Sequence, residues 1–263
     1  MSVTQQEVLP RSGETTECGV GASSSAARYQ RDDGGASPTT PLQPRDLELR
    51  VVPHAVAAAL IVRHHYLHAM AAGARLSFGV FASERMAGAV VLNAGPLGAP
   101  RLVDGASTRD ALNMARLWHS PEAPHNSESR VLGLLVRALR RHTAVRFLVS
   151  YADPAVAPGG VPHVGYVYQA AGWLYTGLSE PQPLFDLGDG RPMHTRSIAS
   201  VWGTHSKPFF EQHGLCVREV PTVGKHRYLC FVDPSWRGRL RVPVLPYPKT
   251  GGEHRGDRRG AAA

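Results

Sequence analysis

Cysteine is scarce in this chain of 263 residues, and no long hydrophobic run occurs in it. The three cysteines, Cys18, Cys216 and Cys230, are odd in number, widely spaced and without a CxxC pair, which argues against a disulfide framework and against a thiolate zinc site. No apolar run approaches the roughly 18 residues of a membrane span, and the first residues lack the apolar core of a secretory signal. We therefore expect a soluble, cytoplasmic protein with no membrane partner.

The beginning of the chain also lacks an apolar pattern. Residues 1–45 are rich in Ser, Thr, Gly, Pro and Gln and would bury too little apolar surface to offset their ordering entropy, so we predict a disordered tail. The overall apolar content of 43% is enough for one substantial core. We expect one globular domain over residues 46–235 and a second, basic and disordered tail over residues 236–263.

Acidic residues are too few to balance the basic ones, and the formal net charge is +8. The whole excess lies beyond residue 45, and between Arg237 and Arg259 seven Lys and Arg residues face only Glu253 and Asp257. Such a segment favours a polyanion such as nucleic acid, with an affinity that comes from counterion release. The alternative is a solvated tail in an arginine-rich protein.

Apolar periodicity predicts a series of helices and strands between residues 53 and 232. Helices are expected over 53–65, 129–142, 165–172, 197–203 and 207–214. Strands are expected over 75–81, 86–94, 112–118, 146–150, 173–178, 183–187 and 227–232, with a hairpin around Gly188 and Gly190. The order predicts an α/β protein with a mixed sheet of α+β type, and it is similar to the order of the GNAT acyltransferase fold.

One stretch, residues 145–176, combines the features of a site. Asp153 directly follows an apolar strand and precedes a loop rich in Gly and Pro, a histidine and two tyrosines. Ligands of mixed helix and strand folds bind beyond the carboxyl ends of strands, where Asp153 stands. Asp153 could equally belong to a turn, because Asp-Pro is common turn chemistry.

Short motifs in a fixed order resemble the phage-encoded Mom family. They are His65-Tyr66, NSESR at 126–130, VSYADP at 149–154, HVGYVYQAAGWLYTG at 163–177, HTRS at 194–197 and GKHRY at 224–228. The resemblance spans residues 52–232 and implies a GNAT-like enzyme that modifies the N6 amine of adenine in double-stranded DNA. It further implies a carbamoyl-type adduct, protection of the DNA from restriction, and dependence on iron.

The resemblance also implies roles for single residues. The metal-site pattern falls on His65, Tyr66 and Asp153, and imidazole, phenolate and carboxylate donors form a mixed set that suits iron. His163 would be a fourth ligand or a proton shuttle, although this chain inserts residues between Pro154 and His163. From spacing alone, His65 and Tyr66 can instead end a helix and pack against it.

The binding of a small-molecule donor is expected at the helix that begins near residue 129. Backbone amides there can hold a phosphate, with Ser129, Arg130 and Gly133 around them, while Tyr168 would line the donor pocket. Only Gly133 remains of the glycines usual at an acyl-CoA site, so acetyl-CoA and another small-molecule donor both stay open. Ser129 can instead be a helix cap, and Tyr168 can belong to the core.

An enzyme that acts on nucleic acid needs aromatic side chains on which a base can stack and basic side chains that bind the flanking phosphates, because adenine must leave the base stack to react. The candidate residues for binding the DNA phosphates are Arg196, Lys225, His226 and Arg227. Two other functions remain open: an acyl-CoA-dependent N-acetyltransferase acting on a small amine or a protein, and a basic DNA-binding or anti-restriction protein without catalysis.

Overall fold

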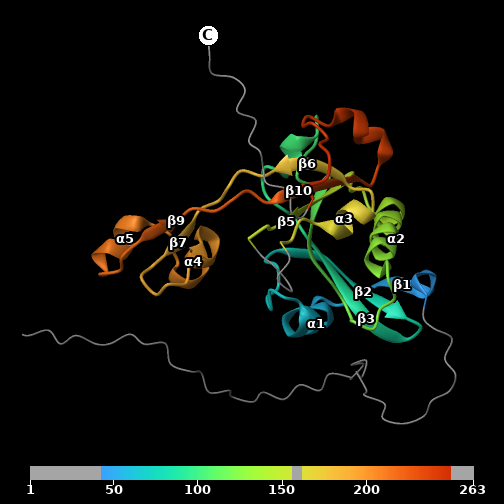
Figure 1. Cartoon of the computed structure of the whole chain (residues 1–263), viewed down its shortest axis with the longest axis horizontal. Helices are drawn as coiled ribbons and strands as arrows, with labels where there is room; N and C mark the ends of the chain where they lie inside the picture. The colour runs from blue at the N-terminus through green and yellow to red at the C-terminus, as the bar shows by residue number, and fades with distance from the viewer. Residues whose placement is uncertain (1–42, 156–161, 250–263) are drawn as a thin grey trace, which may run out of the picture. The chain divides into compact units, whose positions relative to one another are not determined.

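Two β-sheets organise the residues described by the computed structural model, which are 43–155 and 162–249 (Figure 1). The larger sheet has seven strands in the order β1-β2-β3-β4-β5-β10-β6. Its strands are β1 (Leu47–Val51), β2 (Ala74–Ala82), β3 (Arg85–Asn93), β4 (Ala111–His119), β5 (Phe147–Ala152), β10 (His226–Phe231) and β6 (Leu174–Leu178). Every neighbouring pair is antiparallel except β4 and β5, which are parallel. The expected mixed sheet is confirmed.

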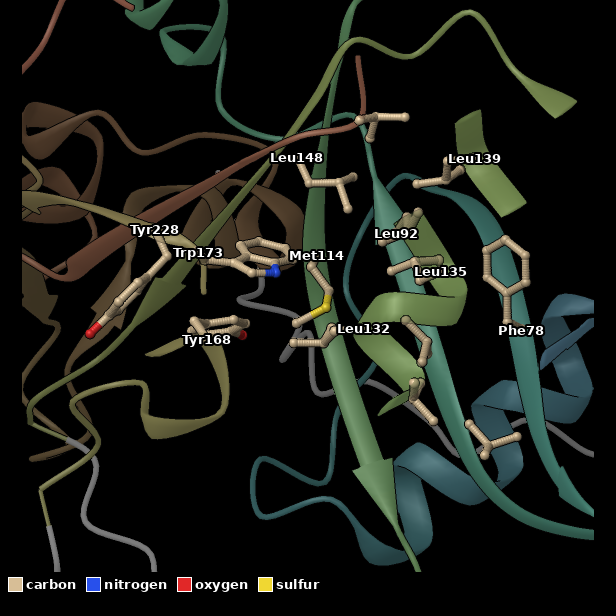
Figure 2. Packing of buried hydrophobic residues seen from close by; sticks show 14 of the residues in the cluster. Phe78, Leu92, Met114, Leu132, Leu135, Leu139, Leu148, Tyr168, Trp173 and Tyr228 are labelled. Carbon is tan, nitrogen blue, oxygen red and sulfur yellow. The ribbon is translucent and has the colours of Figure 1, made fainter. Parts of the chain in front are cut away.

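The two faces of the larger sheet are covered by different helices. Because side chains alternate along a strand, β3 sends Val90 and Leu92 toward α2 (Ser127–His142) and Ala89 and Val91 toward α1 (His54–His64). The main core lies on the α2 face, where the side chains of Leu132, Leu135 and Leu139 meet Met114, Leu148, Tyr168 and Trp173 (Figure 2). The short helix α3 (Tyr166–Ala170) supplies Tyr168.

Strand β4 has an irregularity that changes which side chains share a face. Met114 pairs with Leu92 and Arg116 pairs with Val91, so Ala115 is an extra residue with no partner on β3. This β-bulge reverses the alternation. Leu112, Met114 and Leu117 contact the α2 core, whereas Trp118 contacts the α1 core. Arg116 therefore lies on the α1 face.

Strands β4 and β5 pair over only three residues and then separate. The pairing runs from Ala111–Phe147 to Asn113–Val149, after which β4 follows β3 and β5 follows β10. Beyond this point the facing edges of both strands carry backbone groups that are not used in the sheet. The opening between β4 and β5 stands at the carboxyl end of β5, directly before Asp153.

A smaller sheet between β6 and β10 in the sequence has the order β8-β7-β9. It consists of β7 (Leu184–Asp186), β8 (Met193–His194) and β9 (Arg218–Val220), with helices α4 (Thr195–Trp202) and α5 (Lys207–Gln212). Leu187, Ile198 and Phe210 form its own core. The expected hairpin around Gly188 and Gly190 joins β7 to β8.

The end of the chain differs from the prediction of a disordered tail over residues 236–263. Residues 234–239 form a 3₁₀-helix, Arg241 pairs with Asp104, and Leu245 N–H donates to the carbonyl of Tyr175 on the edge strand β6. Residues 236–249 are thus part of the fold, and the segment around Leu245 covers the edge strand β6. Residues 250–263 lie outside the described part.

At the other end, residues 43–45 of the expected tail over 1–45 are described, and Pro44–Asp46 forms a 3₁₀-helix before β1. Residues 1–42, which include Cys18, lie outside the described part. Strand β1 was not predicted, because its five residues follow directly on a polar segment.

Within residues 43–155 and 162–249, no helix is long and apolar enough to cross a membrane.

The position of α2 gives a test of the main core. Leu135 is fully buried, so Leu135→Ala should lower the free energy of unfolding by about 2–5 kcal/mol through lost packing and a cavity. Arg137 on the same helix is exposed, and Arg137→Ala should change it by less than about 0.5 kcal/mol. Urea denaturation of the full chain measures both values. Equal losses would contradict the placement of α2 on the sheet.

Candidate active site

The end of α1 places two of the predicted site residues side by side. Helix α1 stops at His64, and the chain turns sharply, with His68 in the left-handed region at φ 44°. His65 is buried, and its ring stacks on that of Tyr66 with 4.2 Å between the ring centroids. Tyr66 is 42% exposed and presents its ring edge-on to His163, with 6.1 Å between the centroids. His65, Tyr66 and His163 therefore form one cluster.

Asp153 joins this cluster through its charge. Desolvation is the main cause that raises the pKa of Tyr66 and lowers the pKa of His163, and the charge of Asp153 is a smaller influence on the pKa of both rings. Its Oδ2 atom lies 2.8 Å from Lys225 Nζ, and its Oδ1 atom accepts the N–H of Ala155 at 3.0 Å. Among the described residues, no direct bond links Asp153 to His65. The two residues are neighbours through Tyr66 and His163.

Lys225 is held in place by its own backbone. A Cβ atom at Gly224 would collide with the carbonyl oxygen of Ser179, so glycine permits this close passage of two chain segments. Lys225 N–H then donates to Ser179 Oγ at 3.1 Å, and Ser179 N–H donates to the Lys225 carbonyl at 2.8 Å. The ion pair of Lys225 with Asp153 therefore starts from a well-defined backbone.

Burial keeps the rings of the cluster uncharged near neutral pH. Desolvation, followed by the charges of Arg116 and His163, lowers the pKa of His65 to about 4. Desolvation also lowers the pKa of His163 and raises that of Tyr66. The site consequently holds two neutral imidazoles and a neutral phenol beside a paired carboxylate. A neutral imidazole near a carboxylate can accept a proton.

Arg116 is a site residue that the sequence analysis did not identify. Its Nε donates to the Ala69 carbonyl at 2.8 Å, and its Nη1 donates to the Ala115 carbonyl at 2.7 Å. The hydrogen bond to Ala69 ties Arg116 to the turn that follows His65 and Tyr66. Desolvation lowers the pKa of His65 and raises that of Tyr66, and the charge of Arg116 adds to the first shift and opposes the second. The only available signal was an arginine inside an apolar strand, and the bulge at Ala115 hid the face on which it lies.

Tyr168 lies at the opening between β4 and β5. Ser150 Oγ on β5 donates to the Met114 carbonyl on β4 at 3.0 Å, so this hydroxyl bridges the two strands where they separate, and it lies 2.7 Å from the Tyr168 hydroxyl. Tyr168 is buried, which raises its pKa, and its ring packs against Trp173 and Tyr228 (Figure 2). Tyr168 is therefore a core residue whose hydroxyl group lies at the opening between β4 and β5.

The first turn of α2, where the sequence predicts binding of a small-molecule donor, has backbone amides without a partner among the described residues. Asn126 adopts φ 67° and provides no side-chain cap, and the first bond of the helix runs from Arg130 N–H to the Asn126 carbonyl. The amides of Glu128 and Ser129 have no partner among the described residues. Ser129 Oγ donates to the Asn126 carbonyl, Arg130 Nη2 reaches the Arg45 carbonyl at 3.4 Å, and Gly133 lies inside the helix. Backbone, more than these side chains, is available to an anion.

Most of the residues predicted to bind DNA make contacts with other residues of the protein. Lys225 pairs with Asp153, and Arg227 donates from Nε and Nη2 to Thr176 at 2.9 and 2.8 Å. His226 is buried against Tyr175, with 3.0 Å between Nδ1 and the phenol oxygen, so its ring is not accessible to a phosphate. The side chain of Arg196 lies outside the described part.

Of the predicted iron ligands, His65 and Tyr66 lie side by side, and the donor atoms of His65 and Asp153 do not fit a resident metal ion as they are arranged. His65 Nδ1 accepts the N–H of Leu67 at 3.1 Å, which leaves the proton of the neutral ring on Nε2, whereas a metal-bound histidine normally donates from its second nitrogen. Both oxygens of Asp153 are engaged, one by the ammonium group of Lys225 and one by the backbone N–H of Ala155. Among residues 43–155 and 162–249, no group of three His, Cys, Asp or Glu residues could hold a metal.

The burial of His65 gives a pH test. With a pKa near 4, its imidazole should stay neutral in the folded protein below its ordinary pKa of 6.5, at which the unfolded chain takes up a proton. The folded state should therefore lose stability as the pH falls from about 6.5 to 4. NMR titration of the His65 ring in chelator-treated protein measures the pKa. A value near 6.5, or an unfolding free energy with the same pH dependence in His65→Gln, would contradict this burial.

Comparison with known proteins supports the resemblance seen in the motifs. A phage Mu protein named methylcarbamoylase mom is 25% identical over 213 residues, which cover 78% of this chain and 85% of that protein. Distant solved structures include spermidine N-acetyltransferase from Vibrio cholerae (TM-score 0.40, 9% identity, 74% of this chain and 98% of that one) and Arabidopsis thaliana NAA60 with acetyl-CoA (TM-score 0.40, 10% identity, 70% and 99%). The Mom protein family matches residues 46–249. The chain belongs to the Mom protein family.

Proposed function

We propose that the protein is a transferase that attaches a carbamoyl-type group to the N6 amine of adenine in double-stranded DNA. The name of the phage Mu relative, methylcarbamoylase, supports the type of group. The observation that carries the proposal is the cluster of Tyr66, Asp153, His163 and Arg116 beside the opening between β4 and β5 in a chain of the Mom family. DNA so modified would resist restriction enzymes in the host cytoplasm.

The proposed reaction is an attack of the adenine N6 atom on the carbonyl carbon of an activated small-molecule donor. The bond from carbon to N6 forms, and the bond from carbon to the leaving group breaks, so the leaving group departs with the electron pair. N6 must lose one proton, because the nitrogen becomes positively charged when its lone pair forms the new bond to carbon. A general base at hydrogen-bonding distance would accept this proton.

His163 is the group best suited to accept the proton of N6. Desolvation keeps its imidazole neutral, and the carboxylate of Asp153 opposes this shift and would stabilise the imidazolium that forms. Lys225 orients the carboxylate of Asp153 through the 2.8 Å ion pair. In this scheme His163 is the base, whereas Asp153 and Lys225 stabilise its charged form.

The substrate base would have to leave the duplex to reach this cluster. Extrusion costs a few kcal/mol, which stacking on an aromatic ring can offset. Tyr66 is the exposed ring of the cluster, and its face is supported by the stacked ring of His65. We infer that the flipped adenine stacks at Tyr66, with N6 toward His163.

The donor would bind along the opening between β4 and β5 and at the start of α2. Unpaired backbone groups of the separated strands can bind an extended amide-containing chain, and the free amides of Glu128 and Ser129 can bind its anionic end. Both acetyl-CoA-like molecules and other donors with an anionic end satisfy this chemistry. Iron stays a prediction for this site.

Nucleoside mass spectrometry tests the proposed function. DNA from cells that make the wild type should contain a new adenosine derivative, and its mass increment separates a carbamoyl-type group from an acetyl group. In Asp153→Asn its yield should fall by about 10²-fold or more, because His163 loses the charge that stabilises its protonated form. Asp189→Asn, at an exposed turn, is the matched control and should keep the wild-type yield. Unmodified adenine with the wild type would refute the proposal and favour a DNA-binding protein without catalysis.

The ion pair of Lys225 and Asp153 leads to a metal-binding prediction. An ammonium group 2.8 Å from a carboxylate repels a second cation, so Lys225→Met should raise the affinity for Fe²⁺ by about tenfold over the wild type. Anaerobic titration with Fe²⁺, followed by elemental analysis, measures the affinity. Lys207→Met, at an exposed lysine of α5, should leave it unchanged. Tight stoichiometric iron in the wild type, unaffected by Lys225→Met, would contradict the misfit described above.

A further inference from the structure

We propose that Arg116 is the oxyanion-binding residue of this site. Its guanidinium would receive the carbonyl oxygen of the transferred group and the negative charge that develops there as adenine N6 attacks. The inference rests on the proposed function, and it assigns a catalytic role to a residue that lies outside the resemblance motifs quoted above.

The placement of Arg116 results from the bulge at Ala115. A regular β4 would direct Arg116 to the same face as Met114, into the apolar core against α2. The extra residue turns it to the α1 face, where its charge acts on His65 and Tyr66. Bulges beside active sites commonly redirect a side chain in this way.

The guanidinium of Arg116 is fixed and still has free donors. Two backbone carbonyls, those of Ala69 and Ala115, hold Nε and Nη1 at 2.8 and 2.7 Å. The two hydrogens on Nη2 have no partner among the described residues. Donors held in advance stabilise developing charge without reorganisation during the reaction.

The charge of Arg116 is not neutralised within the described part of the chain. Other arginines, such as Arg50, Arg146 and Arg218, form ion pairs with carboxylates, whereas no carboxylate pairs with Arg116. Its side chain is partly buried, and backbone carbonyls hold its guanidinium in place of a counter-ion. An unpaired and partly desolvated cation is costly unless an anion arrives during function.

The reacting carbonyl oxygen explains these features better than a DNA phosphate. The phosphates of duplex DNA lie on the outside of the helix, whereas Arg116 is partly buried and held by two backbone carbonyls beside the opening between β4 and β5. When N6 attacks, the carbonyl electron pair moves to the oxygen and returns when the leaving group departs. Arg116 would donate hydrogen bonds throughout and transfer no proton, while the N6 proton goes to His163.

The experiment compares Arg116→Ala and Arg116→Lys with Arg63→Ala, an exposed arginine of α1. An undialysed extract of cells that make each full-length variant supplies the donor, and added plasmid DNA is analysed for the adenosine derivative over time. Arg116→Ala should lower the rate by about 10²–10³-fold, as for loss of an oxyanion donor. Arg116→Lys should recover part of the rate, and Arg63→Ala should match the wild type.

Two further readouts separate the oxyanion role from its alternatives. Guanidinium chloride at millimolar concentration should restore part of the rate in Arg116→Ala, and DNA affinity should keep its value and its salt dependence. A salt slope reduced by about one unit would overturn the proposal in favour of a phosphate contact. Loss of the folded state in circular dichroism, without rescue, would overturn it in favour of a structural role. Wild-type rates in Arg116→Ala would refute this inference alone, whereas an inactive wild type would refute the proposed function.

Discussion

The separation of β4 from β5 is the constraint on which the rest of the site depends. Two parallel strands that pair over only three residues leave backbone groups unpaired in the middle of a sheet, which is costly unless other groups occupy the gap. Here the hydroxyl of Ser150 bridges the near end of the gap, beside the hydroxyl of Tyr168. The same opening brings Asp153, at the end of β5, near residues that follow α1.

The charges of the site are arranged so that one cation stays free. Asp153 has its counter-ion in Lys225, and burial keeps His65, Tyr66 and His163 neutral. Arg116 alone keeps an unpaired charge in this cluster, within the described residues. A site of this kind attracts an electron-rich oxygen more readily than a metal cation, because a cation would have to displace Lys225 from the carboxylate.

Membership of the Mom family and the geometry of the cluster provide different information. The family match indicates which chemistry to expect and covers nearly all of the described residues. The geometry distinguishes among the residues that the motifs highlight. It groups His65, Tyr66, Asp153 and His163, gives Tyr168 a place in the core, and keeps His226 and Arg227 occupied inside the protein.

The sequence by itself determined the order of elements, since α1, α2, the hairpin of β2 and β3 and the strand before Asp153 all have clear apolar periodicity. Its motifs also identified the residues that meet in the cluster. Only the tertiary structure decided the partners of these residues and the face on which Arg116 lies. Periodicity describes contacts between near neighbours in sequence, whereas a bulge depends on pairing with β3, and the ion pair of Asp153 with Lys225 joins residues far apart in the chain. The folded end at residues 236–249 was missed for the same reason, because its partner is the distant edge strand β6.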